Sequence, residues 1–118
     1  IGPYPFEIVY DRVTDENAAV TMVLPSHGLL QRPNRISEAD FAGWVQERGL
    51  YFADKLGDKY ETPLSMHDPD EAPSKGSLIF TRFGKGAFIY TGLAFFRQLP
   101  AGVPGAYRLF GNLISYEP

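Results

Sequence analysis

Prolines and glycines are spread along the whole chain, and they interrupt any stretch that could become a long helix or strand. The 118 residues include ten prolines and twelve glycines, without an internal repeat or a low-complexity tract. Because proline disfavours the helical conformation at the residue before it, the opening segment Gly2-Pro3-Tyr4-Pro5 cannot be helical. Short strands are predicted instead at 6–10 and at 19–24, where Pro25 stops the second one.

The clearest local pattern predicts a β-hairpin over residues 77–91. Residues 77–83 and 87–91 are rich in aromatic and β-branched side chains, and the short segment Gly84-Lys85-Gly86 joins them. Two such runs around a glycine-containing turn are typical of a hairpin. A further strand is predicted at 63–67, and residues 68–76, with their prolines and acidic side chains, are predicted as an exposed loop.

Two helices are predicted from capping and periodicity. Ser37 with Asp40 three residues later is typical of a helix start, and a short helix is expected near 37–48. The apolar residues of 103–115 recur at helical spacing, which predicts a C-terminal amphipathic helix lying on a sheet. One helical turn is expected at 26–30. Together these elements predict an α+β or α/β fold with a mixed sheet.

Composition favours one globular domain and excludes several classes of function. Apolar residues make up 44% and charged residues 21% of the chain, as in ordinary globular proteins. A length of 118 residues suffices for one domain but not for two. The net charge of -3 argues against nucleic acid as a partner, because phosphate backbones are held by a basic surface. No apolar run approaches the roughly 18 residues of a membrane span, and the absence of cysteine removes disulfides and thiolate chemistry.

The two histidines give no metal or nucleophile motif. His27 and His67 could join Asp68 or Asp70 at a metal, but no known ligand spacing is present, so no metal and no cofactor are predicted. Ser26 beside His27 lacks the Gly-x-Ser-x-Gly elbow of nucleophilic hydrolases. The turn at 84–86 lacks the longer glycine-rich pattern of a phosphate-binding loop, so it is interpreted as a hairpin turn.

The segment around the single tryptophan holds the main candidate site residues, Trp44, Glu47 and Arg48. One interpretation is a buried Glu–Arg pair that fixes the path of the chain, and losing one partner of such a pair costs about 3–5 kcal/mol. The other is a ligand-facing acid that an arginine orients. Arg97 poses the same alternative, since its guanidinium can stack on aromatic rings or bind a carboxylate. Glu47 with His67 or His27 is the candidate acid–base pair of an enzyme.

Several segments carry a family resemblance. The longest is AFFRQLPAGVPGAYRLF at 94–110, and the others are IGPYPF at 1–6, DRVT at 11–14, PNRI at 33–36, DFAGWVQERGLYF at 40–52 and the run from 84 to 113. They resemble the C-terminal region of bacterial proteins of the LmbE/PIG-L type, the GlcNAc de-N-acetylase-like family. The same region is similar to the end of class I glutamine amidotransferase-like domains, including the ThuA-like group.

The resemblance implies a role without catalysis for this chain. The family's zinc-dependent deacetylase is a separate N-terminal domain, and its His and paired Asp motif has no counterpart here, so no catalytic residue is carried over. Glutaminase chemistry needs a cysteine, which this chain lacks. The chain begins at Ile1 rather than Met, which predicts a processed product or a piece of a longer protein. Earlier strands of an amidotransferase-like domain would then lie upstream, and an unpaired sheet edge would invite homodimerisation.

The sequence therefore predicts a non-catalytic accessory or binding region of a multidomain LmbE/PIG-L-type protein, with the parent's other domains and a carbohydrate as partners. The chain is either a single domain or the C-terminal part of an amidotransferase-like domain. The alternative function is a small hydrolase with a Glu/His acid–base site. The compartment stays open, because a disulfide-free parent can be periplasmic, secreted or cytoplasmic.

Overall fold

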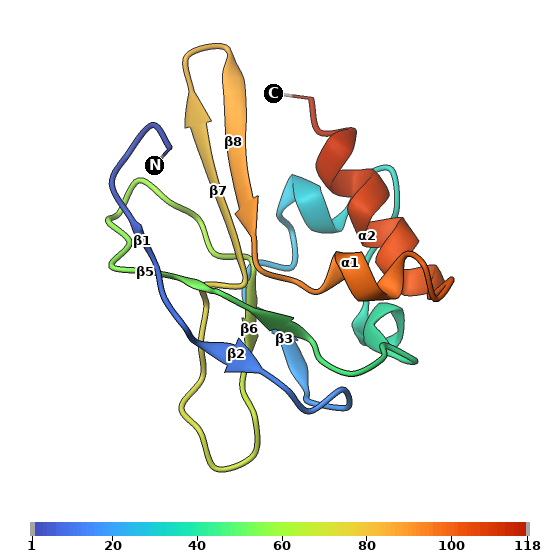
Figure 1. Cartoon of the computed structure of the whole chain (residues 1–118). Coiled ribbons are helices and arrows are strands. Elements are labelled where there is room, and N and C mark those ends of the chain that lie inside the picture. Colours follow the sequence, from blue (N-terminus) through green and yellow to red (C-terminus); the bar gives the residue numbers. More distant parts are fainter. Residues whose placement is uncertain (1, 118) are drawn as a thin grey trace.

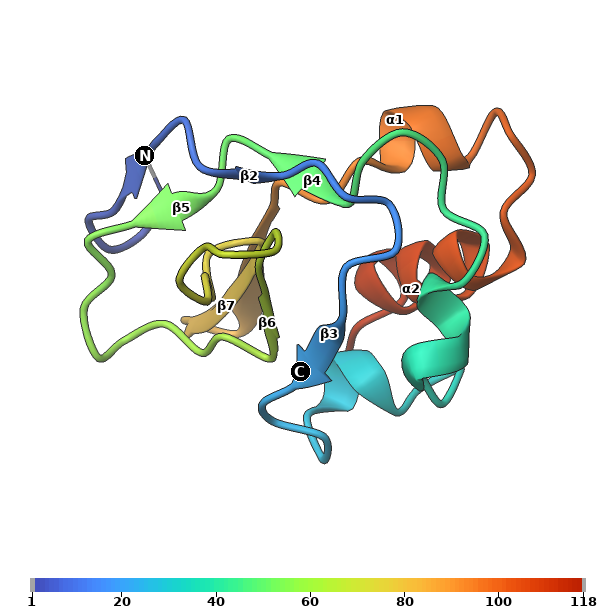
Figure 2. The same ribbon diagram turned by 90° about the horizontal axis from the view of Figure 1, so that it is seen from below.

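The computed structural model describes residues 2–117, with strand pairs on one side of the molecule and helices on the other (Figure 1, Figure 2). The radius of gyration of 13.4 Å agrees with the value of about 13.5 Å expected for a compact chain of this length. The strands are β1 (Glu7–Ile8), β2 (Arg12–Val13), β3 (Val20–Met22), β4 (Gly49–Leu50), β5 (Ala53–Asp54), β6 (Leu64–Met66), β7 (Leu78–Phe83) and β8 (Gly86–Thr91). The helical segments are the 3₁₀ turns η1 (Gly28–Leu30) and η2 (Glu38–Phe41) and the α-helices α1 (Phe95–Gln98) and α2 (Pro104–Ile114).

The strands pair two by two, and each of the four pairs is antiparallel. β1 pairs with β5, β2 with β4, β3 with β6, and β7 with β8. The first two pairs continue one ribbon, because backbone hydrogen bonds join Val9 to Phe52 (2.8 Å) and Phe52 to Asp11 (3.3 Å) between them. The fold is therefore α+β. The α/β alternative and the mixed sheet are wrong for residues 2–117, because every strand pair there is antiparallel.

The hairpin predicted over 77–91 is formed by β7 and β8, the longest strands of the molecule. Their register runs from Leu78 opposite Thr91 to Phe83 opposite Gly86. Gly84, in the turn, has a φ of +59°, which a residue without Cβ adopts at little cost. The turn closes the hairpin.

The helix predicted near 37–48 is wrong beyond Phe41. The chain leaves η2 at Ala42 in an extended conformation, and Gly43 and Gln46 have φ of +77° and +66°. The side chains of Arg48 and Gln98 form hydrogen bonds with backbone groups that a helix would have paired. Arg48 donates to the carbonyl of Phe41, and the Gln98 amide bonds both the N–H of Val45 (2.7 Å) and its carbonyl (3.0 Å).

The C-terminal helix α2 lies within the predicted range 103–115, with Pro104 in its first turn. The turn predicted at 26–30 is present as η1. Residues 92–94 lead from β8 into α1. Among residues 2–117, no helix has the length and apolar character needed to cross a membrane.

Two clusters of buried side chains lie on the two faces of β7. Leu78 and Phe80 belong to the larger cluster with α2, whereas Ile79 belongs to a smaller one with Phe6 and Tyr60. Successive side chains of a strand point to opposite faces, so this one strand separates the two clusters.

Candidate functional site

The main hollow of the molecule is a cleft between the ribbon of β2 and β5 and the loop that follows β6. Its volume is about 750 Å³. The segments that line it are residues 11–13, 53–56, 66–67 and 71–76. We call residues 67–76 the wall loop, because they form the side of the cleft that faces the ribbon.

Hydrogen bonds fix the wall loop at two places. At its base, Met66 and Ser74 exchange two backbone hydrogen bonds of 3.0 and 2.9 Å. At its start, the carboxylate of Asp68 accepts from the N–H of Asp15 (2.7 Å) and from the N–H and hydroxyl of Thr14 (both 2.9 Å). These hydrogen bonds hold the start of the wall loop against residues 14 and 15.

The charge state of Asp68 follows from these donors. Partial burial raises the pKa of its carboxyl, but the hydrogen bonds from Asp15 and Thr14 and the nearby charge of Arg12 lower it by more. The net pKa lies below the usual value for aspartate. Asp68 is thus a carboxylate that organises the wall loop around neutral pH.

The end of the wall loop approaches β5 so closely that only glycine fits. Ala53 donates its N–H to the carbonyl of Gly76 at 2.9 Å. A Cβ on Gly76 would lie 1.9 Å from the carbonyl oxygen of Ala53, which is far inside van der Waals contact. Gly76 therefore sets the width of this end of the cleft.

The cleft has an apolar floor and a charged rim. Val13, Ala53 and Met66 line it and are otherwise buried, with exposures of 1%, 5% and 1%. The exposed rim residues carry both signs of charge in balance: Asp11, Asp54 and Glu71 against Arg12, Lys55 and Lys75, with His67 among them. A concave site with an apolar base and a few polar groups is the usual form of a small-molecule site.

Backbone strain is present at both sides of the cleft. Lys55 on the ribbon side has a φ of +54°, and Asp70 in the wall loop has a φ of +67°. Residues other than glycine rarely adopt this left-handed conformation, and such residues occur preferentially at ligand clamps and active sites. Gln46 and Tyr51, which do not line the cleft, have the same left-handed backbone, so the candidate site rests on the shape and lining of the cleft rather than on strain.

The structure places most of the predicted site residues away from this cleft. Glu47 forms an ion pair with Arg97, whose Nε lies 2.7 Å from Oε1 of the carboxylate. The guanidinium of Arg97 also lies over the ring of Phe96, 4.8 Å from its centroid. Arg97 thus makes both of the contacts that the sequence left as alternatives. The ion pair of Glu47 with Arg97 links the segment around Trp44 to α1.

Arg48 is buried and has a partner other than Glu47. Its guanidinium donates to the carbonyl of Ala18 from Nε (3.1 Å) and Nη2 (2.8 Å), and to the carbonyl of Phe41. Burial lowers its pKa, and the carboxylates of Asp15 and Glu16 oppose that effect. Its hydrogen bonds join three chain segments, which is a structural role.

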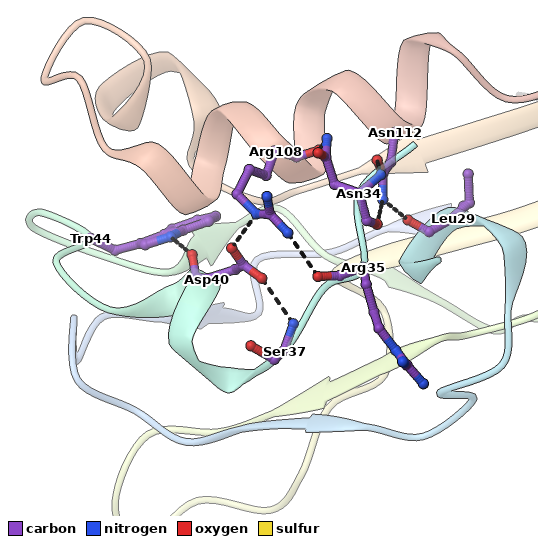
Figure 3. A network of polar contacts seen from close by, with 8 residues as sticks. All are labelled: Leu29, Asn34, Arg35, Ser37, Asp40, Trp44, Arg108 and Asn112. Carbon is purple, nitrogen blue, oxygen red and sulfur yellow. Dashed lines mark hydrogen bonds and ion pairs between the residues drawn. The ribbon is translucent and has the colours of Figure 1, made fainter. Parts of the chain in front are cut away.

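Trp44 lies in the core beside a polar network that the sequence reasoning missed (Figure 3). Its indole N–H donates to the carbonyl of Asp40 at 2.9 Å. The Asp40 carboxylate accepts from the N–H of Ser37 (2.9 Å) and from Nε of Arg108 (2.8 Å). Further along α2, buried Asn112 bonds the backbone of Leu29 and Asn34. The network fastens η1 and η2 to α2. The pairing of Ser37 with Asp40 was visible in the sequence, whereas Arg108 and Asn112 had no local signal.

The two histidines lie in different surroundings. Nε2 of His27 lies 2.7 Å from the carboxylate of Glu61, and Nδ1 accepts from the N–H of Leu29 at 3.1 Å. The ring of His27 also meets Phe80 edge-on, at 4.7 Å between centroids. His67 is exposed on the cleft rim, and its Nδ1 lies 2.9 Å from the carbonyl of Asp68. His67 is therefore the one sequence-predicted candidate that the structure brings to the cleft.

Within residues 2–117, no three side chains of the metal-binding types gather around a common point. The signal that could have pointed to the cleft was the loop 68–76 itself, with its charged residues between two prolines. The strands β2 and β5, which form the other side of the cleft, are distant from this loop in sequence. The sequence alone therefore did not predict the cleft between the loop and these strands.

Comparisons with known proteins add no family to this description. No protein-family model matches the chain, and searches of curated proteins and of solved structures gave no match.

Proposed function

We propose that this chain is a non-catalytic binding region of a larger LmbE/PIG-L-type protein, that it forms part of an amidotransferase-like domain, and that its cleft takes a carbohydrate. The observation that carries the proposal is the cleft, with an apolar floor and a rim of balanced charge. A neutral, polyhydroxylated ligand matches such a rim better than an anion or a cation, because it needs many hydrogen bonds and no net charge.

An exposed aromatic pair outside the cleft lining supports the same ligand class. Tyr10 and Tyr51 are 72% and 45% exposed, and their ring centroids lie 5.2 Å apart. Tyr10 directly precedes the rim residue Asp11 in the chain. Exposed tyrosines combine an apolar ring face with a polar hydroxyl, which suits the alternating surface of a sugar.

Titration calorimetry against a panel of neutral oligosaccharides, including acetylated amino sugars, tests the proposal. We expect binding by at least one of them. His67→Ala and Lys75→Ala, which remove rim side chains, should each weaken it about tenfold, the loss of one to two hydrogen bonds. Lys85→Ala in the hairpin turn is the matched control and should bind like the unchanged chain. Silence across the whole panel, or binding by both rim variants that is as tight as binding by the unchanged chain, would refute the carbohydrate cleft.

The contact between His27 and Glu61 favours a second candidate, the small hydrolase. A shallow hollow of about 500 Å³ lies beside this pair and includes Ser26. Both ring nitrogens of His27 are already engaged, so a proton could be accepted only after the bond from Leu29 is broken. The acid in contact is Glu61 rather than the expected Glu47. An ester- or amide-hydrolysing activity that disappears in His27→Gln, with the fold retained, would favour this candidate over the binding region.

A further inference from the structure

In the β7–β8 hairpin, β8 forms an unpaired edge. The hydrogen bonds to β7 show which residues of β8 direct their backbone groups outward. Within residues 2–117, β8 has β7 as its partner strand on one side and no strand on the other. Gly92 donates its N–H to the carbonyl of Ser77 at 2.8 Å. In an antiparallel ladder the direction of backbone groups alternates, so Ala87, Ile89 and Thr91 direct theirs away from β7.

The edge lacks two of the features that normally prevent strand addition. β8 has the sequence GAFIYT, without a charged residue or a proline. Native proteins protect free edges with lysine, proline, bulges or covering segments. Its side chains from Phe88 to Thr91 are half-buried, so a strand added here would cover apolar surface as well as satisfy backbone groups.

We propose that this edge pairs with β8 of a second copy of the chain, antiparallel and about a two-fold axis, to give a four-stranded sheet across the dimer. A two-fold interface needs a self-complementary surface, and an uncharged strand meets itself without like-charge repulsion. Lys85 stands directly before the strand. Antiparallel pairing puts the two Lys85 side chains at opposite ends, roughly 20 Å apart for six residues at 3.4 Å each. That separation exceeds the screening length of about 8 Å, whereas a parallel arrangement would place the two charges together.

Sedimentation equilibrium of the chain over a concentration series, with amide hydrogen exchange at the same concentrations, tests this interface. We expect a monomer–dimer equilibrium in which the amides of Ala87, Ile89 and Thr91 become slower to exchange as the dimer forms. A chain that stays monomeric at millimolar concentration overturns the proposal and leaves the edge to a strand from a different partner. A dimer in which these three amides stay unprotected overturns it as well.

A matched pair of substitutions locates the interface. Ala87 and Ala101 are both exposed, the first on β8 and the second between α1 and α2. Ala87→Lys should raise the dimer dissociation constant at least tenfold, because a lysine on an edge strand opposes the addition of a further strand, and Ala101→Lys should leave it unchanged. Ala87→Pro, which removes one outward N–H and adds no charge, should act in the same direction as Ala87→Lys.

The exposed apolar side of α2 supplies the competing interface. Ile114 is 71% exposed there. Ile114→Ser should not change the dimer dissociation constant. A dimer that is lost in Ile114→Ser and kept in both Ala87 variants contradicts edge pairing.

Discussion

Single charged side chains in this protein act on backbone groups that are distant in sequence. Arg48 closes onto the carbonyls of Ala18 and Phe41, and Asp68 onto the amides of Thr14 and Asp15. These side chains pair backbone N–H and C=O groups that no helix or strand pairs. A backbone group that is buried without a hydrogen-bond partner lowers the free energy of unfolding. Their residue types were visible in the sequence as charged positions, but their partners were not.

The carboxyl group of Asp68 makes the free energy of unfolding depend on pH. Its pKa is lower in the folded chain than the usual unfolded value of about 3.9, so its contribution is full above that value and is lost as the pH falls through the folded-state pKa. Asp68→Asn should therefore lower the melting temperature by several degrees at pH 7, and the difference should shrink as the pH falls below about 3.9.

Thermal unfolding followed by circular dichroism from pH 3 to 7 measures this effect. Asp70→Asn is the control, because Asp70 is exposed and asparagine tolerates its left-handed backbone. A difference between Asp68→Asn and the unchanged chain that persists undiminished at pH 3 would contradict the role given to the carboxylate.

At the scale of elements, α2 is positioned by close approach as much as by its apolar face. Gly105 lies against η2, where an added Cβ would meet the carbonyl oxygen of Asp40 at 1.7 Å. The spacing of apolar residues was enough to predict α2, because helix periodicity is a local property. The segment 42–48 failed the same reasoning, because the side chain of Gln98 in α1 bonds the backbone of Val45, and Arg48 donates back to the carbonyl of Phe41.

Replacing either of two glycines of α2 by alanine should change the stability of the chain in opposite directions. Gly105→Ala should destabilise the chain by about 3 kcal/mol, since the new methyl group can be placed only by moving the helix away from η2. Gly111→Ala should stabilise it by about 1 kcal/mol, because alanine is the better helix former and its Cβ would meet Asn34 at an ordinary 3.8 Å.

Urea unfolding at equilibrium gives the free energy of unfolding for both variants. A loss of stability in Gly111→Ala as large as that in Gly105→Ala would show that the helix, rather than its contact with η2, is intolerant of alanine.

At the scale of the whole molecule, β7 divides the apolar interior into two unequal parts. The smaller cluster, around Phe6, Tyr60 and Ile79, fastens β1 and β5, which border the cleft. The larger one includes Leu109 of α2 and most of the other buried side chains. Regions that few buried contacts hold together open locally before the whole chain unfolds.

Shortening a buried side chain should therefore affect a different set of amides in each cluster. Phe6→Ala should accelerate amide exchange in β1 and β5 and leave the slow amides of α2 nearly unchanged. Leu109→Ala should cost about 3 kcal/mol and accelerate all slow amides together. Native-state hydrogen exchange separates the two patterns, and equal acceleration of α2 in both variants would mean that the clusters unfold as one.

The sequence alone determined the hairpin, the C-terminal helix and the absence of thiol chemistry, since turn residues, periodicity and composition act over a few neighbouring positions. It also marked the charged residues that turned out to matter. Only the tertiary structure decided their partners, the pairing of β2 and β5 with distant strands, and the cleft between that ribbon and the wall loop. These depend on contacts between segments that lie far apart in the chain, such as β2 with β4 and β1 with β5, for which no local pattern of side chains carries the information.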